Sequence, residues 1–284
     1  MYRFPIGVIL ESFRTDRSTA IRQAASMGAQ GIQMYATYGE NAPESLNAAA
    51  RRALLDEVKS HGMVFSALCG DLGRGFGNKE LNPELIERSK RILDLAKDLE
   101  TDIVTTHIGV VPQDRSEERY KIMQEACYEL SRYADSVGAH FAIETGPETA
   151  VTLKGFLDGL GSRGVAVNLD PANLRMVLGD DPVQAVYTLK DYIVHTHAKD
   201  GRLLYKTKPE YFYGVTPMPE ELRGVQLFEE VPLGTGQVDF PNYLKALEDI
   251  GYKGFLTIER EVGDTPAVDI QTAFDFLTKT IREN

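Results

Sequence analysis

Residues 165–200 read VAVNLDPANLRMVLGDDPVQAVYTLKDYIVHTHAKD. The segment begins and ends with short, β-branched apolar runs, Val165–Asp170 and Ile193–Ala198, which are typical of buried strands. A helix is expected between them, starting at Asp181-Pro182, because proline is favoured in a first helical turn. A strand, a helix and a second strand in this order form a βαβ unit, whose two strands run parallel.

The same alternation extends along the whole chain. Eight strands are expected: Phe4–Leu10, Gly31–Ala36, Met63–Leu68, Asp102–His107, Phe141–Thr145, Val165–Asp170, Ile193–Ala198 and Gly254–Glu259. Amphipathic helical patterns lie between them, at residues 83–99, 117–137, 182–192, 240–250 and 269–281. Dividing 284 residues among eight units, 284/8, gives about 35 residues each, which fits a closed barrel.

We therefore predict an α/β fold, a (β/α)8 TIM barrel, as a single domain over residues 1–284. The alternative is an open doubly wound sheet, which usually has a glycine-rich phosphate loop after its first strand. Here the first strand is followed by ESFRTDR, residues 11–17, which contains no glycine.

One connection is much longer than the others. Residues 201–238 separate the seventh strand from the next helix, and they are rich in tyrosine and phenylalanine. A long connection in a compact domain is usually functional or disordered, and the aromatic content argues against disorder. We expect this loop to cover the active-site mouth or to form a contact between copies of the chain, as in a homo-oligomer.

Composition and charge exclude several classes of partner. The formal net charge is −11, and no basic face is evident, which disfavours nucleic acid. No apolar stretch approaches the roughly 18 residues of a membrane span, and the first residues show no signal-peptide pattern. Cys69 and Cys127 form no ligand motif, and we expect both to be reduced. These features favour a cytoplasmic protein without a membrane partner.

Chemically reactive side chains gather at the ends of the later strands. The strand ends carry His107, then Glu144, then Asp170, then His195, His197, Lys199 and Asp200, and finally Glu259 and Glu261. In a βα barrel the carboxyl ends of the strands meet at one rim, which is where functional residues lie.

Carboxylates that converge in a low-dielectric site repel one another, and a bound cation relieves that repulsion. Oxygen ligands with one imidazole suit Mn²⁺, Mg²⁺, Co²⁺ or Zn²⁺. Alternation along the strand places His195 and His197 on the same face. His197 is nearer the carboxyl end and is the better ligand, whereas His195 is expected one layer deeper in the core.

Four motifs together resemble one known family. They are ETGPE (144–148), NLDPANL (168–174), HTHAKD (195–200) and LTIERE (256–261). Their order and spacing, with PLGTGQVDF at 232–240, resemble the xylose isomerase-like TIM-barrel superfamily. That group includes sugar phosphate isomerases and epimerases, ketose 3-epimerases, inosose dehydratases and the endonuclease IV branch.

The resemblance implies a ligand set and a chemistry. It implies one divalent metal ion, with Mn²⁺ favoured over Zn²⁺, Mg²⁺ and Co²⁺, held by Glu144, Asp170, His197 and Glu259. It also implies that Glu144 and Glu259 are catalytic, one removing a proton beside a carbonyl and the other returning it.

The chain also departs from the family's pattern. Ketose 3-epimerases have a histidine three residues after the metal-binding aspartate, where this chain has Asn173. The further histidines and the aspartate of a trinuclear phosphodiesterase site are absent apart from His107. The residues that we expect to contact substrate are His107, Arg202, Asn173, Glu11 and Lys199.

The resulting hypothesis is a metal-dependent isomerase or epimerase that acts on a sugar, a sugar phosphate or a polyol-derived ketone through an enediolate. An inosose-type dehydratase is the alternative, since it shares the same early chemistry. An apurinic endonuclease-like phosphodiesterase and a non-catalytic sugar-binding barrel are less favoured.

Overall fold

The computed structural model describes residues 2–283. Eight parallel strands close into a barrel in the order β1-β10-β7-β6-β5-β4-β3-β2. They are β1 (Ile6–Ile9), β2 (Gly31–Tyr35), β3 (Val64–Cys69), β4 (Ile103–Thr106), β5 (His140–Glu144), β6 (Val165–Leu169), β7 (Ile193–Ala198) and β10 (Leu256–Ile258). The predicted TIM barrel is confirmed; β7 has the predicted bounds, and the other seven strands are shorter or shifted by one or two residues at an end.

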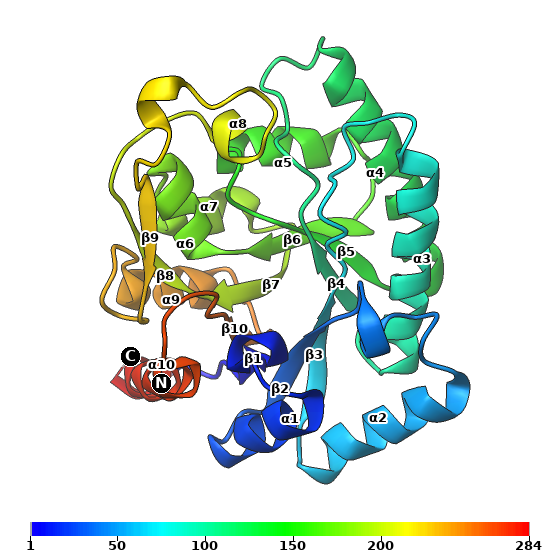
Figure 1. Cartoon of the computed structure of the whole chain (residues 1–284), viewed down its shortest axis with the longest axis vertical. Coiled ribbons are helices and arrows are strands. Elements are labelled where there is room, and N and C mark those ends of the chain that lie inside the picture. Colours follow the sequence, from blue (N-terminus) through cyan, green and yellow to red (C-terminus); the bar gives the residue numbers. More distant parts are fainter. Residues whose placement is uncertain (1, 284) are drawn as a thin grey trace.

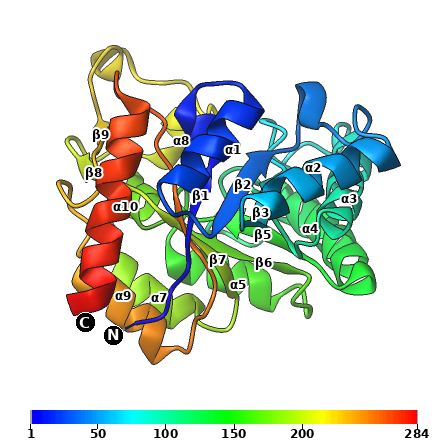
Figure 2. The same ribbon diagram turned by 90° about the horizontal axis from the view of Figure 1, so that it is seen from below.

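Helices surround the barrel strands (Figure 1). They are α1 (Arg17–Ser26), α2 (Ala48–Ser60), α3 (Asn82–Asp98), α4 (Glu118–Val137), α5 (Ala150–Asp158), α6 (Pro171–Asn173), α7 (Pro182–Leu189), α9 (Phe240–Asp249) and α10 (Pro266–Glu283). Their apolar faces and the strands form one continuous core. The long helix α10 lies beside the N-terminal segment, where Tyr2 N donates to Ile281 O at 3.3 Å (Figure 2).

Residues 201–238 contain secondary structure of their own. Strands β8 (Asp200–Leu203) and β9 (Phe228–Val231) pair antiparallel, and the short helix α8 (Pro209–Phe212) lies between them. Both strands and the helix appear at the same side of the barrel in Figure 1. Asp200, which immediately precedes this loop, holds the loop's other end in place.

Asp200 is buried, and its carboxylate accepts four backbone N–H groups. They belong to Gly201 (2.8 Å), Gly234 (3.0 Å), Gly236 (2.8 Å) and Val238 (3.1 Å). A Cβ atom on Gly236 would lie only 2.1 Å from Asp200 Oδ1, so only glycine fits there. The backbone of the PLGTG segment therefore wraps around Asp200, the last residue of the HTHAKD segment.

No helix among residues 2–283 combines the length and the apolar character that crossing a bilayer requires.

Replacing Asp200 with alanine should destabilise the folded chain by about 2–4 kcal/mol, because several buried N–H groups lose their acceptor at once. The measurement is urea unfolding of the full chain followed by circular dichroism. Asp56→Ala, at an exposed position on α2, is the matched control and should change the free energy of unfolding by less than about 0.5 kcal/mol. Equal effects of the two substitutions would show that Asp200 does not hold the loop.

Candidate metal centre

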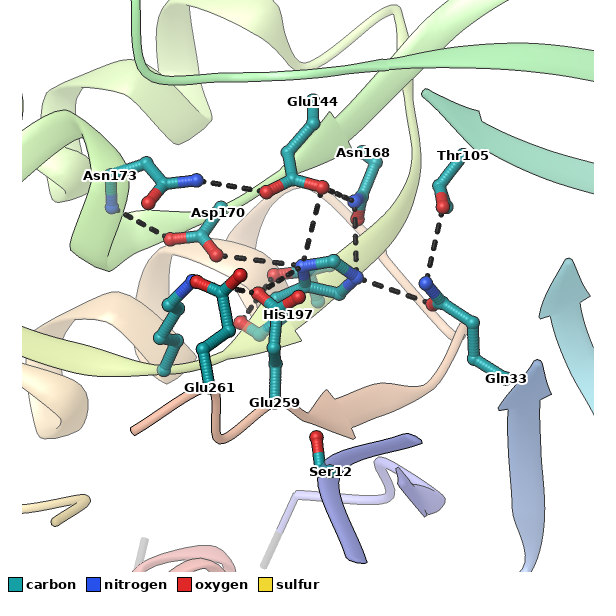
Figure 3. A network of polar contacts seen from close by, with 12 residues as sticks. Ser12, Gln33, Thr105, Glu144, Asn168, Asp170, Asn173, His197, Glu259 and Glu261 are labelled. Carbon is teal, nitrogen blue, oxygen red and sulfur yellow. Dashed lines mark hydrogen bonds and ion pairs between the residues drawn. The ribbon is translucent and has the colours of Figure 1, made fainter. Parts of the chain in front are cut away.

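Four side chains from four adjacent strands meet at the carboxyl end of the barrel. Glu144 ends β5, Asp170 follows β6, His197 lies in β7 and Glu259 follows β10. One ligand atom from each lies within 4.8 Å of all the others, and all four residues are buried. Figure 3 shows the three carboxylates placed around the imidazole.

His197 Nδ1 is the centre of this cluster. It lies 3.2 Å from Glu259 Oε2, 3.4 Å from Asp170 Oδ2 and 3.6 Å from Glu144 Oε2. Neither Nδ1 nor Asp170 Oδ2 has a hydrogen-bond partner, although both atoms are buried. Buried polar atoms are rarely left without a partner, so these two indicate a ligand.

The other nitrogen of His197 determines which tautomer the ring adopts. Nε2 lies 3.2 Å from Gln33 Oε1, an acceptor, and Gln33 Nε2 donates to Thr105 Oγ1 at 3.1 Å. Asn168 Nδ2 lies 3.2 Å from the same nitrogen, so Nε2 faces both an acceptor and a donor. The tautomer with its proton on Nε2 donates to Gln33 and leaves a lone pair on Nδ1 facing the carboxylates. This is the form of histidine that binds a metal.

The backbone around Asp170 fixes its carboxylate. Asp170 is the N-cap of α6, and its Oδ1 accepts from Asn173 N at 2.7 Å, so only Oδ2 faces the cluster. Thr145 Oγ1 accepts from Asp170 N at 2.9 Å and donates to Asp170 O at 3.0 Å. A carboxylate held this rigidly is preorganised as a ligand.

Glu144 is held by two amides. Asn173 Nδ2 donates to Glu144 Oε1 at 2.8 Å, and Asn168 Nδ2 donates to Glu144 Oε2 at 3.3 Å. His107 Nε2 lies 3.5 Å from Glu144 Oε1. Burial raises the pKa of Glu144 to about 7, against the opposing effect of the two histidines. Its carboxyl is therefore suited to exchange a proton near neutral pH.

Glu259 has the opposite environment. Lys199 Nζ donates to Glu259 Oε2 at 3.0 Å, and it also pairs with Glu261. Burial alone would raise the pKa of Glu259, but Lys199 and His197 outweigh it and hold the pKa well below its usual range. Lys199 is itself buried, so this ion pair is shielded from solvent.

A cavity of about 720 Å³ opens above the cluster. Of the four ligand candidates, Glu144, His197 and Glu259 line it. Of the residues expected to contact substrate, His107, Asn173 and Lys199 line it as well. The imidazole of His107 has a raised pKa, because nearby carboxylates outweigh the effect of its burial.

Two of the residues expected to contact substrate lie elsewhere. Glu11 is not among the lining side chains; its Oε1 accepts from Tyr35 N at 3.0 Å, and burial raises its pKa to about 7. Arg202 also does not line the cavity; it binds Glu229 Oε1 at 3.0 Å and Thr235 O at 2.5 Å. Glu11 thus supports the strand end that carries Tyr35, and Arg202 braces the β8–β9 hairpin.

His195 occupies the deeper layer predicted for it. Its ring is fully buried and lies edge-on to that of His197, with 6.0 Å between the ring centroids. Burial and the neighbouring imidazole hold its pKa well below the usual value, so it is neutral. It is not part of the four-residue cluster.

Sequence reasoning missed several residues of the site. Gln33 and Asn168 each interrupt an otherwise apolar strand, and that interruption was a usable signal. Phe212, Tyr213 and Phe228 reach the cavity from the long loop; its aromatic content is visible in the sequence, but which rings face the cavity is not. Asp71, after β3, gave no signal.

The fold and this donor set define a class: a parallel α/β barrel with a buried carboxylate–imidazole cluster at the carboxyl ends of its strands. Residues 21–280 match the model of the family described as xylose isomerase-like TIM barrel. The chain belongs to this family, as its motifs indicated.

The chain is also similar to individual proteins. An inosose dehydratase from Clostridium beijerinckii is 26% identical over 152 residues, which are 51% of this chain and 48% of that protein. The match thus spans about half the length of this curated relative.

A xylose isomerase domain protein from Planctomyces limnophilus superimposes with a TM-score of 0.80, at 24% identity over 99% of this chain and 98% of that one. A D-tagatose 3-epimerase-like protein gives 0.74, at 16% identity over 98% and 97%. At these identities the two structures show that the fold is shared.

Asp170→Asn should weaken Mn²⁺ binding at least tenfold, because the substitution replaces a charged carboxylate ligand with a neutral amide. For the wild-type protein, Mn²⁺ at about 100 times its Kd should stabilise the fold by about 2.7 kcal/mol. Calorimetric titration and thermal unfolding of metal-free protein measure both effects. Asp71→Asn, in the same cavity but outside the cluster, should retain the wild-type affinity. Equal affinities for wild type and Asp170→Asn would contradict a metal centre here.

Gln33→Met keeps the side chain's volume but removes the acceptor that faces His197 Nε2. Metal affinity should fall about 10- to 100-fold, as when an outer partner of a metal-binding histidine is lost. The same titration measures it, and unchanged affinity would show that Gln33 does not set the tautomer.

Proposed function

We propose that the chain is a divalent-metal-dependent enzyme that interconverts sugars or polyol-derived ketones by moving a proton on the carbon next to a carbonyl. The observation that carries the proposal is the cluster itself: three buried carboxylates around Nδ1 of His197, at the floor of a cavity. Mn²⁺ is the favoured ion, with Zn²⁺, Mg²⁺ and Co²⁺ as alternatives.

The metal would be held by Glu144, Asp170, His197 and Glu259. When bound, it supplies a Lewis acid that polarises the carbonyl and hydroxyl oxygens of the substrate and stabilises the enediolate. All four donors come from strand ends, so the barrel holds them rigidly.

The two glutamates supply the acid and the base. One removes the proton beside the carbonyl, and the other delivers a proton to the resulting enediolate. Both side chains line the cavity, and both are anchored by neighbours, Glu144 by Asn173 and Glu259 by Lys199. His107 beside Glu144 Oε1 is placed to donate a hydrogen bond to a substrate oxygen.

A dehydratase of the inosose type is the second candidate. It begins with the same proton removal but then expels a hydroxyl group as water. The partial match to an inosose dehydratase favours it, and Asn173 in place of the epimerases' histidine weakens the case for a ketose 3-epimerase.

The proposal is tested by incubating Mn²⁺-loaded protein in D₂O with a panel of ketoses and inososes. Solvent deuterium should appear on the carbon beside the carbonyl, as followed by NMR and mass spectrometry. Loss of water from the same substrate would identify the dehydratase, whereas retention of all atoms would identify the isomerase or epimerase.

Glu144→Gln and Glu259→Gln should each lower the exchange rate about 10²- to 10⁴-fold, because each removes one partner of the proton transfer. The assays use saturating Mn²⁺, so that weaker metal binding is not mistaken for lost chemistry. Glu248→Gln, at an exposed position on α9, is the control. Exchange at the wild-type rate in both cavity variants would refute the proposed mechanism.

A further inference from the structure

The charge of the cavity wall restricts which substrates can enter it. Six carboxylates line the cavity, from Asp71, Glu144, Glu229, Glu230, Glu259 and Glu261. Among residues 2–283, the only lysine or arginine that lines it is Lys199, whose Nζ is already paired with Glu259 and Glu261. The wall therefore offers a substrate hydrogen-bond acceptors, but no unpaired lysine or arginine.

The usual phosphate-binding position of a TIM barrel is formed by the loops after the last two barrel strands. In this chain those loops contain Lys206, Lys208 and Arg223, none of which lines the cavity, and Arg202 and Arg260, which are both occupied. Arg202 pairs with Glu229, and Arg260 pairs with Glu230 at 2.6 Å and with Asp269 at 2.8 Å. Neither guanidinium is left to bind a phosphate group.

A bound divalent ion does not reverse this balance. With Asp170, seven carboxylates surround the cavity and its floor, against Lys199 and the arginines that pair with Glu229 and Glu230. Three lysine and arginine side chains and two charges from the ion leave two negative charges, and a proton on His107, whose pKa is raised, still leaves one. A dianionic phosphate group would enter against that field.

The rest of the wall suits an uncharged sugar. Tyr35, Phe212, Tyr213 and Phe228 provide aromatic surface, and the rings of Phe212 and Phe228 lie 5.2 Å apart at their centroids. Apolar faces of a polyol can pack on these rings, while its hydroxyl groups donate to the surrounding carboxylates.

We propose that the cavity takes an uncharged polyhydroxy ketone and discriminates against the phosphate ester of the same sugar. This rests on the proposed function, because it specifies the substrate of the same site. It separates this chain from members of its family that act on sugar phosphates.

The test uses the full chain loaded with Mn²⁺ and measures binding directly, by calorimetric titration and by the rise in Tm. The probes are D-fructose, D-tagatose, D-psicose, D-xylulose and L-ribulose, each beside its terminal phosphate ester, together with one uncharged inosose. Inorganic phosphate controls for extraction of the metal by the esters. At least one uncharged probe should bind at millimolar concentration, and any ester of a binding ketose should bind at least about tenfold more weakly.

Charge variants test the cause. Glu229→Gln removes the partner of Arg202, and Asp71→Asn removes an unpaired charge of the wall. Each should improve binding of the ester about three- to tenfold relative to the neutral sugar. Glu248→Gln is distant from the cavity and should leave the ratio unchanged.

An ester that binds wild-type protein as tightly as its parent sugar would overturn the inference. So would the failure of every uncharged probe to bind, since a cavity for polyhydroxy ketones should bind one of them. The proposed chemistry fails separately: binding of neutral ketoses without deuterium exchange would refute proton transfer and leave the substrate class standing.

Discussion

The repulsion among three buried carboxylates is the constraint on which the site depends. Glu144, Asp170 and Glu259 converge on one imidazole in a region that water scarcely reaches. Such a group of charges is stable only with a positive charge among them. Lys199 neutralises Glu259 from one side, but among residues 2–283 no lysine or arginine pairs with Glu144 or Asp170, and only the imidazoles of His107 and His197 lie beside them. A divalent ion fits this deficit in both charge and donor chemistry.

The barrel makes this costly arrangement possible. Each donor lies at the end of a strand whose neighbours are fixed by parallel pairing; for example, Glu144 is in register with Asn168, and His197 with Thr257. Beyond the barrel strands, Asp200 accepts four backbone N–H groups and so joins the two ends of the long loop that lines the cavity. The rigid strand ends and the loop of residues 201–238, which is fixed at both its ends, together define the cavity's shape.

Much of the fold and the core of the site could be predicted from the sequence. Strand alternation and the position of acids at strand ends are local signals, and they sufficed for the barrel and for the four candidate ligands. The supporting contacts are not local. Gln33 is 164 residues from His197, and only the closed barrel brings β2 opposite β7. Likewise, nothing near Arg202 in the sequence reveals that Glu229 holds it, because their pairing depends on the register of β8 and β9.

The most direct test of the central claim is anomalous diffraction from a crystal of the full chain grown with Mn²⁺. The expected result is one strong anomalous peak among Glu144, Asp170, His197 and Glu259, with donor distances of about 2.0–2.4 Å. A map with no peak there, in which a second lysine or arginine or a protonated His197 instead neutralises the carboxylates, would contradict the metal centre and the chemistry that depends on it.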